Sequence, residues 1–174
     1  MARVRWALLI SFALLAAIGA GCDAGGGGGP STAAGPARAA TVVRVVDGDT
    51  LVARVGGADE RVRLLGVDAP ESVTPDRPVE CFGPQAAAEA RRLMPRGARI
   101  SLAADPTQGE RDRFGRLLAE VTVAGDATTV NEELVAGGFA EVFRGDGRAP
   151  LLPSLRQAES AARAARRGLW GACR

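Results

Sequence analysis

The sequence predicts an α+β fold: a five-stranded OB-fold barrel with a helix between strands three and four and two helices near the C-terminus. Residues 41–67 carry three β-rich runs separated by short glycine-containing turns. An alanine-rich helical segment follows, then two further β-rich runs and a helical C-terminal part. Three strands, one helix and two strands is the element order of an OB-fold barrel.

The first three strands are predicted to form a meander. "TVVRVV" (41–46) and "TLVARV" (50–55) flank an Asp-Gly turn, which is a strong hairpin signal between β-rich runs. "GGADE" supplies a second turn before "RVRLLGV" (61–67), the third strand. The fourth and fifth strands are predicted at 98–104 and 116–123, on either side of a polar loop.

Three helices are predicted from periodicity and from their ends. "QAAAEARRLM" (85–94) lies between two prolines, which limit a helix. In "TTVNEELVAGGF", Thr129 and Glu132 have the spacing of a capping box. "LLPSLRQAESAARAARRGLW" (151–170) has the pattern of a long amphipathic helix that ends at Gly168.

The first 21 residues have the pattern of an export signal. Arg3 and Arg5 precede a short apolar run that ends in small residues. The run stops at Cys22 in "IGAGC", which resembles a lipoprotein box although Gly19 stands where leucine is usual. Two alternatives follow: Cys22 is acylated and becomes the new N-terminus, or an ordinary signal cleavage occurs nearby.

Residues 22–40 consist mostly of Gly, Ala, Ser and Pro and lack apolar periodicity. Such composition is typical of a flexible linker. The sequence therefore predicts a single folded domain over residues 41–173. We expect the protein to be exported, either held at the cell surface or periplasmic membrane as a lipoprotein or secreted.

Charge and composition exclude some kinds of chemistry. The chain has 22 basic and 20 acidic residues; loss of the two signal-peptide arginines leaves 20 against 20, so overall charge gives no argument for nucleic-acid binding. The chain has no histidine, which excludes a histidine base, nucleophile or metal ligand. A metal ion would be held by carboxylates and carbonyls, which favour hard cations such as Ca²⁺ or Mg²⁺.

Two cysteines remain outside the signal region. Cys81 precedes the first predicted helix, and Cys173 lies at the C-terminus. In an exported protein two such cysteines favour a disulfide, the alternative being two unpaired thiols.

Charged side chains occur at the ends of the predicted strands. Asp49 begins strand two, Arg63 lies in strand three, Asp68 and Glu71 follow that strand, and Arg116 begins strand five. A small barrel can gather strand ends at one mouth, which would bring three carboxylates and two guanidiniums together.

This combination suits hydrolysis of a phosphodiester. Two carboxylates can bind a hard cation beside the phosphate, and a third can orient or deprotonate a water molecule. Planar guanidinium groups match phosphate oxygens and stabilise charge that develops on them. Phosphoryl chemistry depends mainly on positioning and electrostatics, so the absence of histidine is no obstacle.

With these residues placed, the sequence resembles the thermonuclease (staphylococcal-nuclease-like) family. The resemblance covers about residues 41–171 and rests on motifs in the same order, which are "VVDGDTLV", "VRLLGVDAPE", "CFGPQA", "DRFGR", "VNEELVAGGFAEV" and "GLWG". It implies an OB-fold nuclease that depends on Ca²⁺ and cuts DNA and RNA to 3′-phosphate products.

The resemblance also implies roles for individual residues. Asp49, Asp68 and the backbone carbonyl of Ala69 would be calcium ligands, with alanine where the family often has threonine. Glu71 would be the general base or would orient the attacking water. Arg63 and Arg116 would clamp the phosphate.

The roles of several neighbouring residues stay open. Arg113 falls where the family has a basic residue near the nucleotide, although a solvated loop arginine explains it equally well. The chain has no tyrosine, so Phe114 or Phe143 could stack on a base but offers no hydroxyl group. Asp47 is interpreted mainly as turn chemistry, with a lesser effect on the field of the ion.

Two classes of function remain open at this point. One is a metal-dependent nuclease acting as a monomer on DNA and RNA, with single strands favoured. The other is a non-catalytic OB module that binds single strands. Degenerate binding modules tend to lose their acidic and arginine residues, so the presence of all five favours the enzyme.

Overall fold

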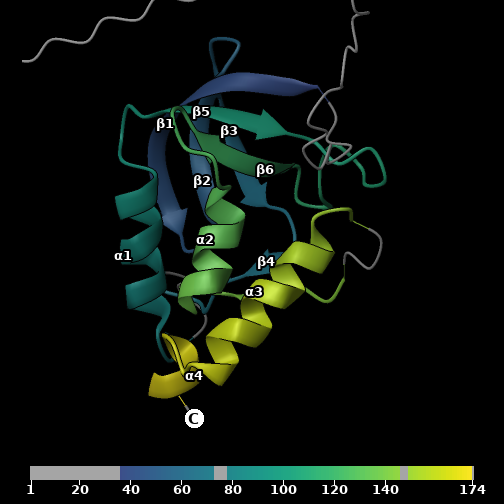
Figure 1. Cartoon of the computed structure of the whole chain (residues 1–174). Coiled ribbons are helices and arrows are strands. Elements are labelled where there is room, and N and C mark those ends of the chain that lie inside the picture. The colour runs from purple at the N-terminus through teal and green to yellow at the C-terminus, as the bar shows by residue number, and fades with distance from the viewer. Residues whose placement is uncertain (1–35, 73–77, 146–148, 174) are drawn as a thin grey trace, which may run out of the picture. The chain divides into compact units, whose positions relative to one another are not determined.

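Five strands close into a barrel in the spatial order β1-β2-β3-β6-β5 (Figure 1). The computed structural model describes residues 36–72, 78–145 and 149–173; the predicted signal peptide, Cys22 and most of the linker lie outside them. Adjacent strands are antiparallel except β3 and β6, which run parallel. The barrel strands are β1 (Ala37–Asp47), β2 (Thr50–Val55), β3 (Ala58–Leu64), β5 (Arg99–Ala103) and β6 (Leu117–Val123).

The barrel interior is filled by apolar side chains that alternate along the strands. Each strand contributes at least one side chain that is no more than 4% exposed, as in Val42, Leu51, Val62, Ile100 and Val121. Burial of a side chain of this size stabilises the fold by about 1.5–3 kcal/mol. The predicted barrel and its helix between the third and fourth barrel strands are therefore present.

The N-terminal strand begins earlier than predicted. Residues 37–40 belong to β1 and pair with β5, from Ala37 opposite Ala103 to Ala40 opposite Ile100. The predicted linker boundary at residue 40 is therefore wrong for these four residues. Their alanine-rich sequence has little β-propensity, and the unpaired backbone of β5 supplies the hydrogen bonds that order them.

The third predicted strand is divided in two. β3 begins at Ala58, because the turn at Gly56–Gly57 is shorter than expected, and it ends at Leu64. After a turn, β4 (Val67–Asp68) leaves the barrel and pairs with β7 (Glu141–Val142) in a separate small sheet. The prediction of one strand over 61–67 is wrong on this point, and β7 was not predicted.

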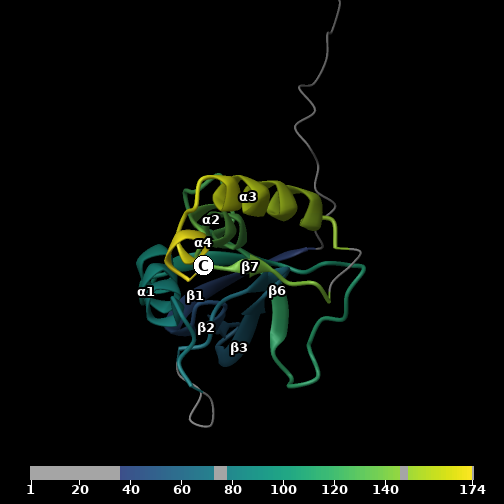
Figure 2. The same cartoon turned by 90° about the horizontal axis from the view of Figure 1, so that it is seen from below.

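The described residues form four helices outside the barrel, and α1 and α2 pack on its strands (Figure 1). α1 (Gly83–Leu93) buries Ala86, Ala87 and Ala90, and α2 (Val130–Gly137) is capped by Thr129, whose hydroxyl accepts a hydrogen bond from the Glu132 amide at 3.2 Å. Figure 2 shows α3 (Leu152–Ala164) lying over α2, on the side away from the strands. The short α4 (Leu169–Ala172) ends the described chain.

The long helix predicted over residues 151–170 is divided into two helices, α3 and α4. α3 ends at Ala164, and Arg166 then adopts a left-handed conformation with φ of 50°. The Leu169 amide donates to the Gly138 carbonyl at 2.9 Å, which turns the chain back and lets Trp170 pack in a small cluster with Ala162. The prediction of one helix to Gly168 is therefore wrong.

A buried asparagine joins α2 to the barrel. The amide of Asn131 is fully buried; its nitrogen donates to the Leu65 carbonyl and its oxygen accepts from the Val121 amide, both at 2.9 Å. Leu65 belongs to the turn that leads into β4, so these bonds fix where Asp68 emerges from the barrel. Among the described residues, no helix has the length and apolar character needed to cross a membrane.

Candidate active site

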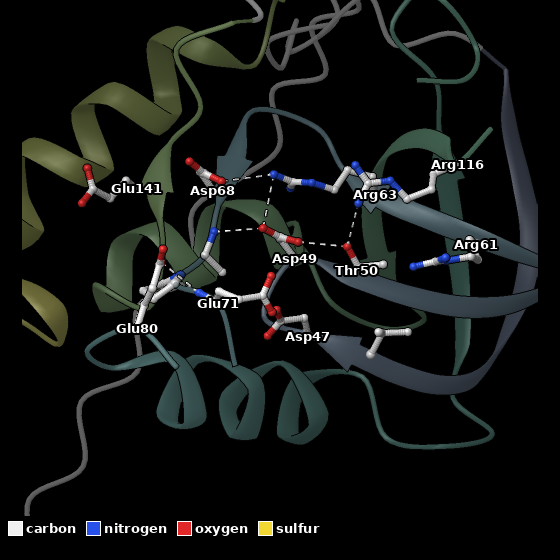
Figure 3. A pocket seen from close by; sticks show the side chains of 13 residues that line it. Asp47, Asp49, Thr50, Arg61, Arg63, Asp68, Glu71, Glu80, Arg116 and Glu141 are labelled. Atoms are coloured by element: carbon white, nitrogen blue, oxygen red, sulfur yellow. Dashed lines mark hydrogen bonds and ion pairs between the residues drawn. The ribbon is translucent and has the colours of Figure 1, made fainter. Parts of the chain in front are cut away.

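One polar cavity of about 440 Å³ opens at the mouth of the barrel (Figure 3). It collects residues from β1, β2, β3, β4 and β7, from the turn between β1 and β2, and from the loops before α1 and β6. The lining residues are Val46, Asp47, Asp49, Thr50, Arg61, Arg63, Asp68, Ala69, Pro70, Glu71, Glu80, Arg116 and Glu141. The six residues predicted as metal ligands or catalytic groups are all among them.

Asp49 is held by two hydrogen bonds in the turn directly before β2. Its Oδ1 accepts from the Thr50 hydroxyl at 2.9 Å, and its Oδ2 accepts from the Ala69 amide at 3.0 Å. The second bond brings the β1–β2 turn close to the loop that contains Ala69. The two segments are so close that a Cβ on Gly48 would lie 2.6 Å from the Ala69 Cβ. Glycine at position 48 therefore permits the contact between the turn and the loop.

The guanidinium of Arg63 lies between two of the predicted ligands. Its Nη2 is 3.2 Å from Asp49 Oδ2 and 3.4 Å from Asp68 Oδ1 (Figure 3). Its Nη1 donates to the carbonyls of Leu64 and Val67, at 3.1 and 2.6 Å. Arg63 thus fixes the turn between β3 and β4 and supplies positive charge between the two carboxylates.

The carboxyl of Asp68 lies among several other acidic groups. Burial raises the pKa of Asp68; the Arg63 charge opposes this rise, while Asp49, Glu141 and Glu80 add to it. A group in this environment is stabilised in its charged form by additional positive charge.

Glu71 lies in the loop between β4 and α1, beside Asp47. The Asp47 carboxyl accepts from the Gly48 amide at 2.8 Å, as turn chemistry requires, and from the Ser72 hydroxyl at 2.6 Å. Burial raises the pKa of Asp47; the Ser72 bond lowers it, and contact with the Glu71 carboxyl raises it again. Asp47 therefore links the β1–β2 turn to the loop that carries Glu71.

Arg116 reaches the cavity from the loop before β6. Its Nε pairs with Asp112 Oδ2 at 2.6 Å, and its Nη1 is 3.4 Å from the Thr50 hydroxyl. Asp112 also accepts from the amides of Phe114 and Arg116, at 2.9 and 3.0 Å. The carboxylate of Asp112 thus orders the loop and aims the guanidinium of Arg116.

Two predicted substrate-binding residues lie beside the cavity and do not line it. The ring of Phe114 is 67% exposed, with the guanidinium carbons of Arg113 and Arg116 at 4.7 and 5.4 Å from its centre. Phe143 is also partly exposed, and its ring centre is 5.9 Å from the Arg63 guanidinium carbon. The two exposed aromatic rings therefore contact two of the three arginines that line the cavity, Arg116 and Arg63.

The two cysteines are joined in a disulfide, with Cα atoms 5.9 Å apart. The bond connects Cys81, just before α1, to Cys173 at the end of α4 across a sequence separation of 92 residues. For a loop of this length, the loss of unfolded-chain entropy stabilises the fold by at most about 4–5 kcal/mol.

The cavity also contains polar residues that sequence reasoning did not assign. Thr50 and Arg61 lie on barrel strands, where an alternating pattern gives no sign of function. Glu80 precedes Cys81 in an irregular segment, and Glu141 lies opposite Asp68 in the small sheet. For Glu141 no local signal existed, because β7 has only two residues.

The charges of the cavity fit a bound cation. Six carboxylates line it against three guanidiniums, which leaves a formal charge of −3. The carboxylate and carbonyl oxygens of Asp49, Asp68 and Ala69 are donors that hard cations prefer. Within the ranges that the structure describes, no three Asp, Glu, Cys or His side chains form a metal-holding group, so an ion here would need the backbone carbonyl and solvent as further ligands.

Comparisons with known proteins agree with this geometry. Residues 61–172 match the family model "Staphylococcal nuclease homologue". The chain is 31% identical to a thermonuclease of Staphylococcus hyicus over 129 residues, which are 74% of this chain and 73% of the relative. It is 39% identical to a thermonuclease of Staphylococcus intermedius over 99 residues, 57% of this chain and 56% of the relative. An uncharacterized endonuclease of Escherichia coli is 33% identical over 129 residues, 74% of each chain. The chain therefore belongs to the staphylococcal nuclease family.

Proposed function

We propose that this protein is a calcium-dependent endonuclease that hydrolyses DNA and RNA to products with 3′-phosphate ends. Membership of a family whose relatives are named thermonuclease and endonuclease supports a hydrolytic nuclease. The observation that carries the proposal is the convergence of Asp49, Asp68 and Glu71 with Arg63 and Arg116 in one cavity.

The carboxylates of Asp49 and Asp68 and the carbonyl of Ala69 would hold the ion. When bound there, a divalent cation supplies positive charge to a non-bridging phosphate oxygen and lowers the pKa of nearby water. The net negative charge of the lining favours a cation over a neutral ligand. The absence of nitrogen and sulfur donors among these residues favours calcium or magnesium over softer metals.

Glu71 is proposed to hold the attacking water and to accept its proton. The water oxygen then forms a bond to phosphorus while the bond from phosphorus to the 5′ oxygen breaks. The phosphate stays on the 3′ side, and the leaving oxygen takes up a proton from solvent water to become a 5′-hydroxyl. The contact of Glu71 with Asp47 places a second acidic group beside the one that takes the proton.

Arg63 and Arg116 are proposed to bind the phosphate oxygens as negative charge develops on them. Both guanidiniums are held by carboxylates and line the same cavity, so little reorganisation is needed when the substrate enters. Arg113 and the exposed ring of Phe114 are proposed to contact the nucleotide outside the cavity, by charge and by stacking.

Export is part of the proposal, because the signal-like residues 1–21 precede the domain and a disulfide suits an oxidising compartment. Acylation at Cys22 would leave the protein tethered to a membrane by lipid alone, and ordinary cleavage would release it. The enzyme is proposed to act as a monomer.

The test is digestion of single-stranded DNA and RNA with added Ca²⁺ and with excess EGTA. We expect cleavage with Ca²⁺, none with EGTA, and 3′-phosphate ends identified by mass spectrometry of the products. Cleavage that persists in EGTA would remove calcium from the mechanism. A gel shift without cleavage would instead favour a binding module.

A further inference from the structure

Glu80 binds the backbone of Glu71 through two hydrogen bonds. The Glu80 amide donates to the Glu71 carbonyl at 2.9 Å, and the Glu80 Oε2 accepts from the Glu71 amide at 3.0 Å. Both main-chain hydrogen-bonding groups of Glu71 are therefore bound by the same residue, through one main-chain and one side-chain contact. Figure 3 shows Glu80 and Glu71 side by side at the rim of the cavity.

The start of α1 packs directly on this pair. A Cβ on Gly83 would lie 2.3 Å from the Glu71 carbonyl oxygen, so only glycine fits there. The Gly83 amide also donates to the Glu80 carbonyl at 3.0 Å. Any shift of residues 80–83 would therefore move the backbone of Glu71.

One residue of this segment, Phe82, has a strained backbone conformation. Phe82 has φ of 69°, in the left-handed region that is unfavourable for a residue with a side chain. Its ring packs 5.6 Å from the ring of Phe139 and against a buried cluster formed by Ala162, Leu169 and Trp170. This packing compensates for the backbone conformation.

The disulfide ties the same segment to the C-terminus. Cys81 lies between Glu80 and Phe82, and its partner Cys173 ends α4 and packs against the same cluster as Phe82. α4 is itself held by the bond from the Leu169 amide to the Gly138 carbonyl and by the Arg163 guanidinium, 3.9 Å from the Trp170 ring centre. Cys81 is exposed, so the bond is accessible to a reductant.

We propose that Glu80 is a positioning residue for Glu71 and that the Cys81–Cys173 disulfide holds Glu80 in place. The inference rests on the proposed role of Glu71 in proton transfer. Loss of either the Glu80 carboxylate or the disulfide leaves the barrel and its two arginines in place but lets Glu71 move. A displacement of about 1 Å at a reacting group can cost about 100-fold in rate.

The first test compares Glu80→Ala, Glu80→Gln and the control Glu89→Ala, whose carboxylate pairs with Arg92 on α1 and does not line the cavity. We expect kcat to fall about 10- to 100-fold in E80A with KM changed less than about threefold, because the phosphate-binding arginines are untouched. Glutamine keeps an acceptor for the Glu71 amide, so E80Q should restore most of the kcat lost in E80A. Equal loss in both variants would mean that the charge of Glu80 matters, and would overturn the positioning role.

Amide hydrogen exchange provides a readout that does not depend on activity. The Glu71 amide should exchange faster in E80A than in wild type or E80Q, because it loses its acceptor. Unchanged exchange at Glu71 in E80A would contradict the inference, whatever the kinetics show.

The second test reduces the disulfide with a phosphine, which becomes a phosphine oxide as the bond takes up two electrons and two protons. A mass increase of two hydrogens verifies reduction. We expect kcat to fall as in E80A while the far-UV circular dichroism stays native, and Cys81→Ser/Cys173→Ser should have the same low kcat and no response to the phosphine. Full activity after reduction, or global unfolding at the assay temperature, would overturn the role of the disulfide in positioning.

Glu71→Gln in the same assay separates the two proposals. If Glu71→Gln keeps wild-type turnover, the proposed catalytic role of Glu71 is wrong. If Glu71→Gln loses turnover while E80A and the reduced protein keep it, only the positioning inference is wrong.

Discussion

The two sides of the cavity are held in different ways. Arg63 lies on β3 and Asp49 directly precedes β2, and Thr50 lies opposite Arg63 in the register of these two paired strands. Glu71 lies in a loop outside any strand, and its backbone bonds go to Glu80. One side is therefore fixed by the strand ladder and the hydrophobic core, and the other by a few polar contacts and a disulfide.

The two sides also have different proposed roles. The barrel side would bind the ion and the phosphate, and the loop side would carry out the proton transfer. Substitutions on the barrel side should affect both activity and stability, because the same residues hold the turns of the barrel. Substitutions of polar side chains on the loop side should affect turnover and leave the free energy of unfolding almost unchanged, whereas loss of the disulfide should also lower the free energy of unfolding.

The largest effect is expected for Glu71→Gln, on the loop side. Removing the group proposed to accept the proton should lower kcat about 10²- to 10⁴-fold. Steady-state kinetics on single-stranded DNA measures this, and thermal unfolding should give a midpoint close to that of wild type. A rate near that of wild type in the folded variant would remove Glu71 from the proposed chemistry.

Replacing either of the two proposed phosphate-binding arginines should lower activity to a similar extent, but the two variants should differ in stability. Arg116→Ala and Arg63→Ala should each lower kcat about 10²- to 10³-fold, as expected for a donor that binds developing charge. Only Arg63 also donates to main-chain carbonyls, those of Leu64 and Val67. Arg63→Ala should therefore lower the free energy of unfolding by about 1–3 kcal/mol more than Arg116→Ala does. Urea denaturation measures this difference. Equal stability of the two variants would contradict the structural role of Arg63.

A smaller effect is expected at Asp112, which aims Arg116 through the 2.6 Å ion pair. Asp112→Asn keeps the side-chain shape but removes the charge, so we expect kcat to fall about tenfold. In Arg116→Ala the same substitution should have almost no further effect on kcat. Additive losses in the double variant would show that Asp112 does not act through Arg116.

The smallest effect is expected at Ser72, which joins the loop to the barrel through its bond to Asp47. Loss of this hydrogen bond removes one of the contacts that position the loop, so Ser72→Ala should lower kcat about threefold to fivefold. The measurement is the same cleavage assay, with Ser72→Thr as the control that keeps the hydroxyl. A loss as large as that of Glu71→Gln would mean that Ser72 takes part in the chemistry itself.

The sequence predicted the barrel side of the cavity better than the loop side. Asp49 and Asp68 follow or begin β-rich runs, so alternation of apolar residues was enough to place them at a mouth of the barrel. Glu80 and Glu141 could not be predicted, because their positions depend on the packing of α1 and on a strand of two residues.

The errors in the element boundaries have similar causes. Residues 37–40 are ordered by the hydrogen bonds of β5 and not by their own propensity. The end of α3 at Ala164 could not be read from an alanine- and arginine-rich stretch with helix propensity throughout; it follows from packing of α4 against the rest of the chain. Local sequence carries no information about such distant partners.

The most direct test of the proposed ion site is a Ca²⁺ titration of ¹⁵N-labelled protein followed by NMR. We predict saturable shifts of the amides of residues 49 and 68–71, with half-saturation at millimolar Ca²⁺ or below, and their loss in Asp68→Asn. Shifts that are absent from these residues in wild type, or that persist unchanged in Asp68→Asn, would contradict a cation site formed by Asp49, Asp68 and Ala69.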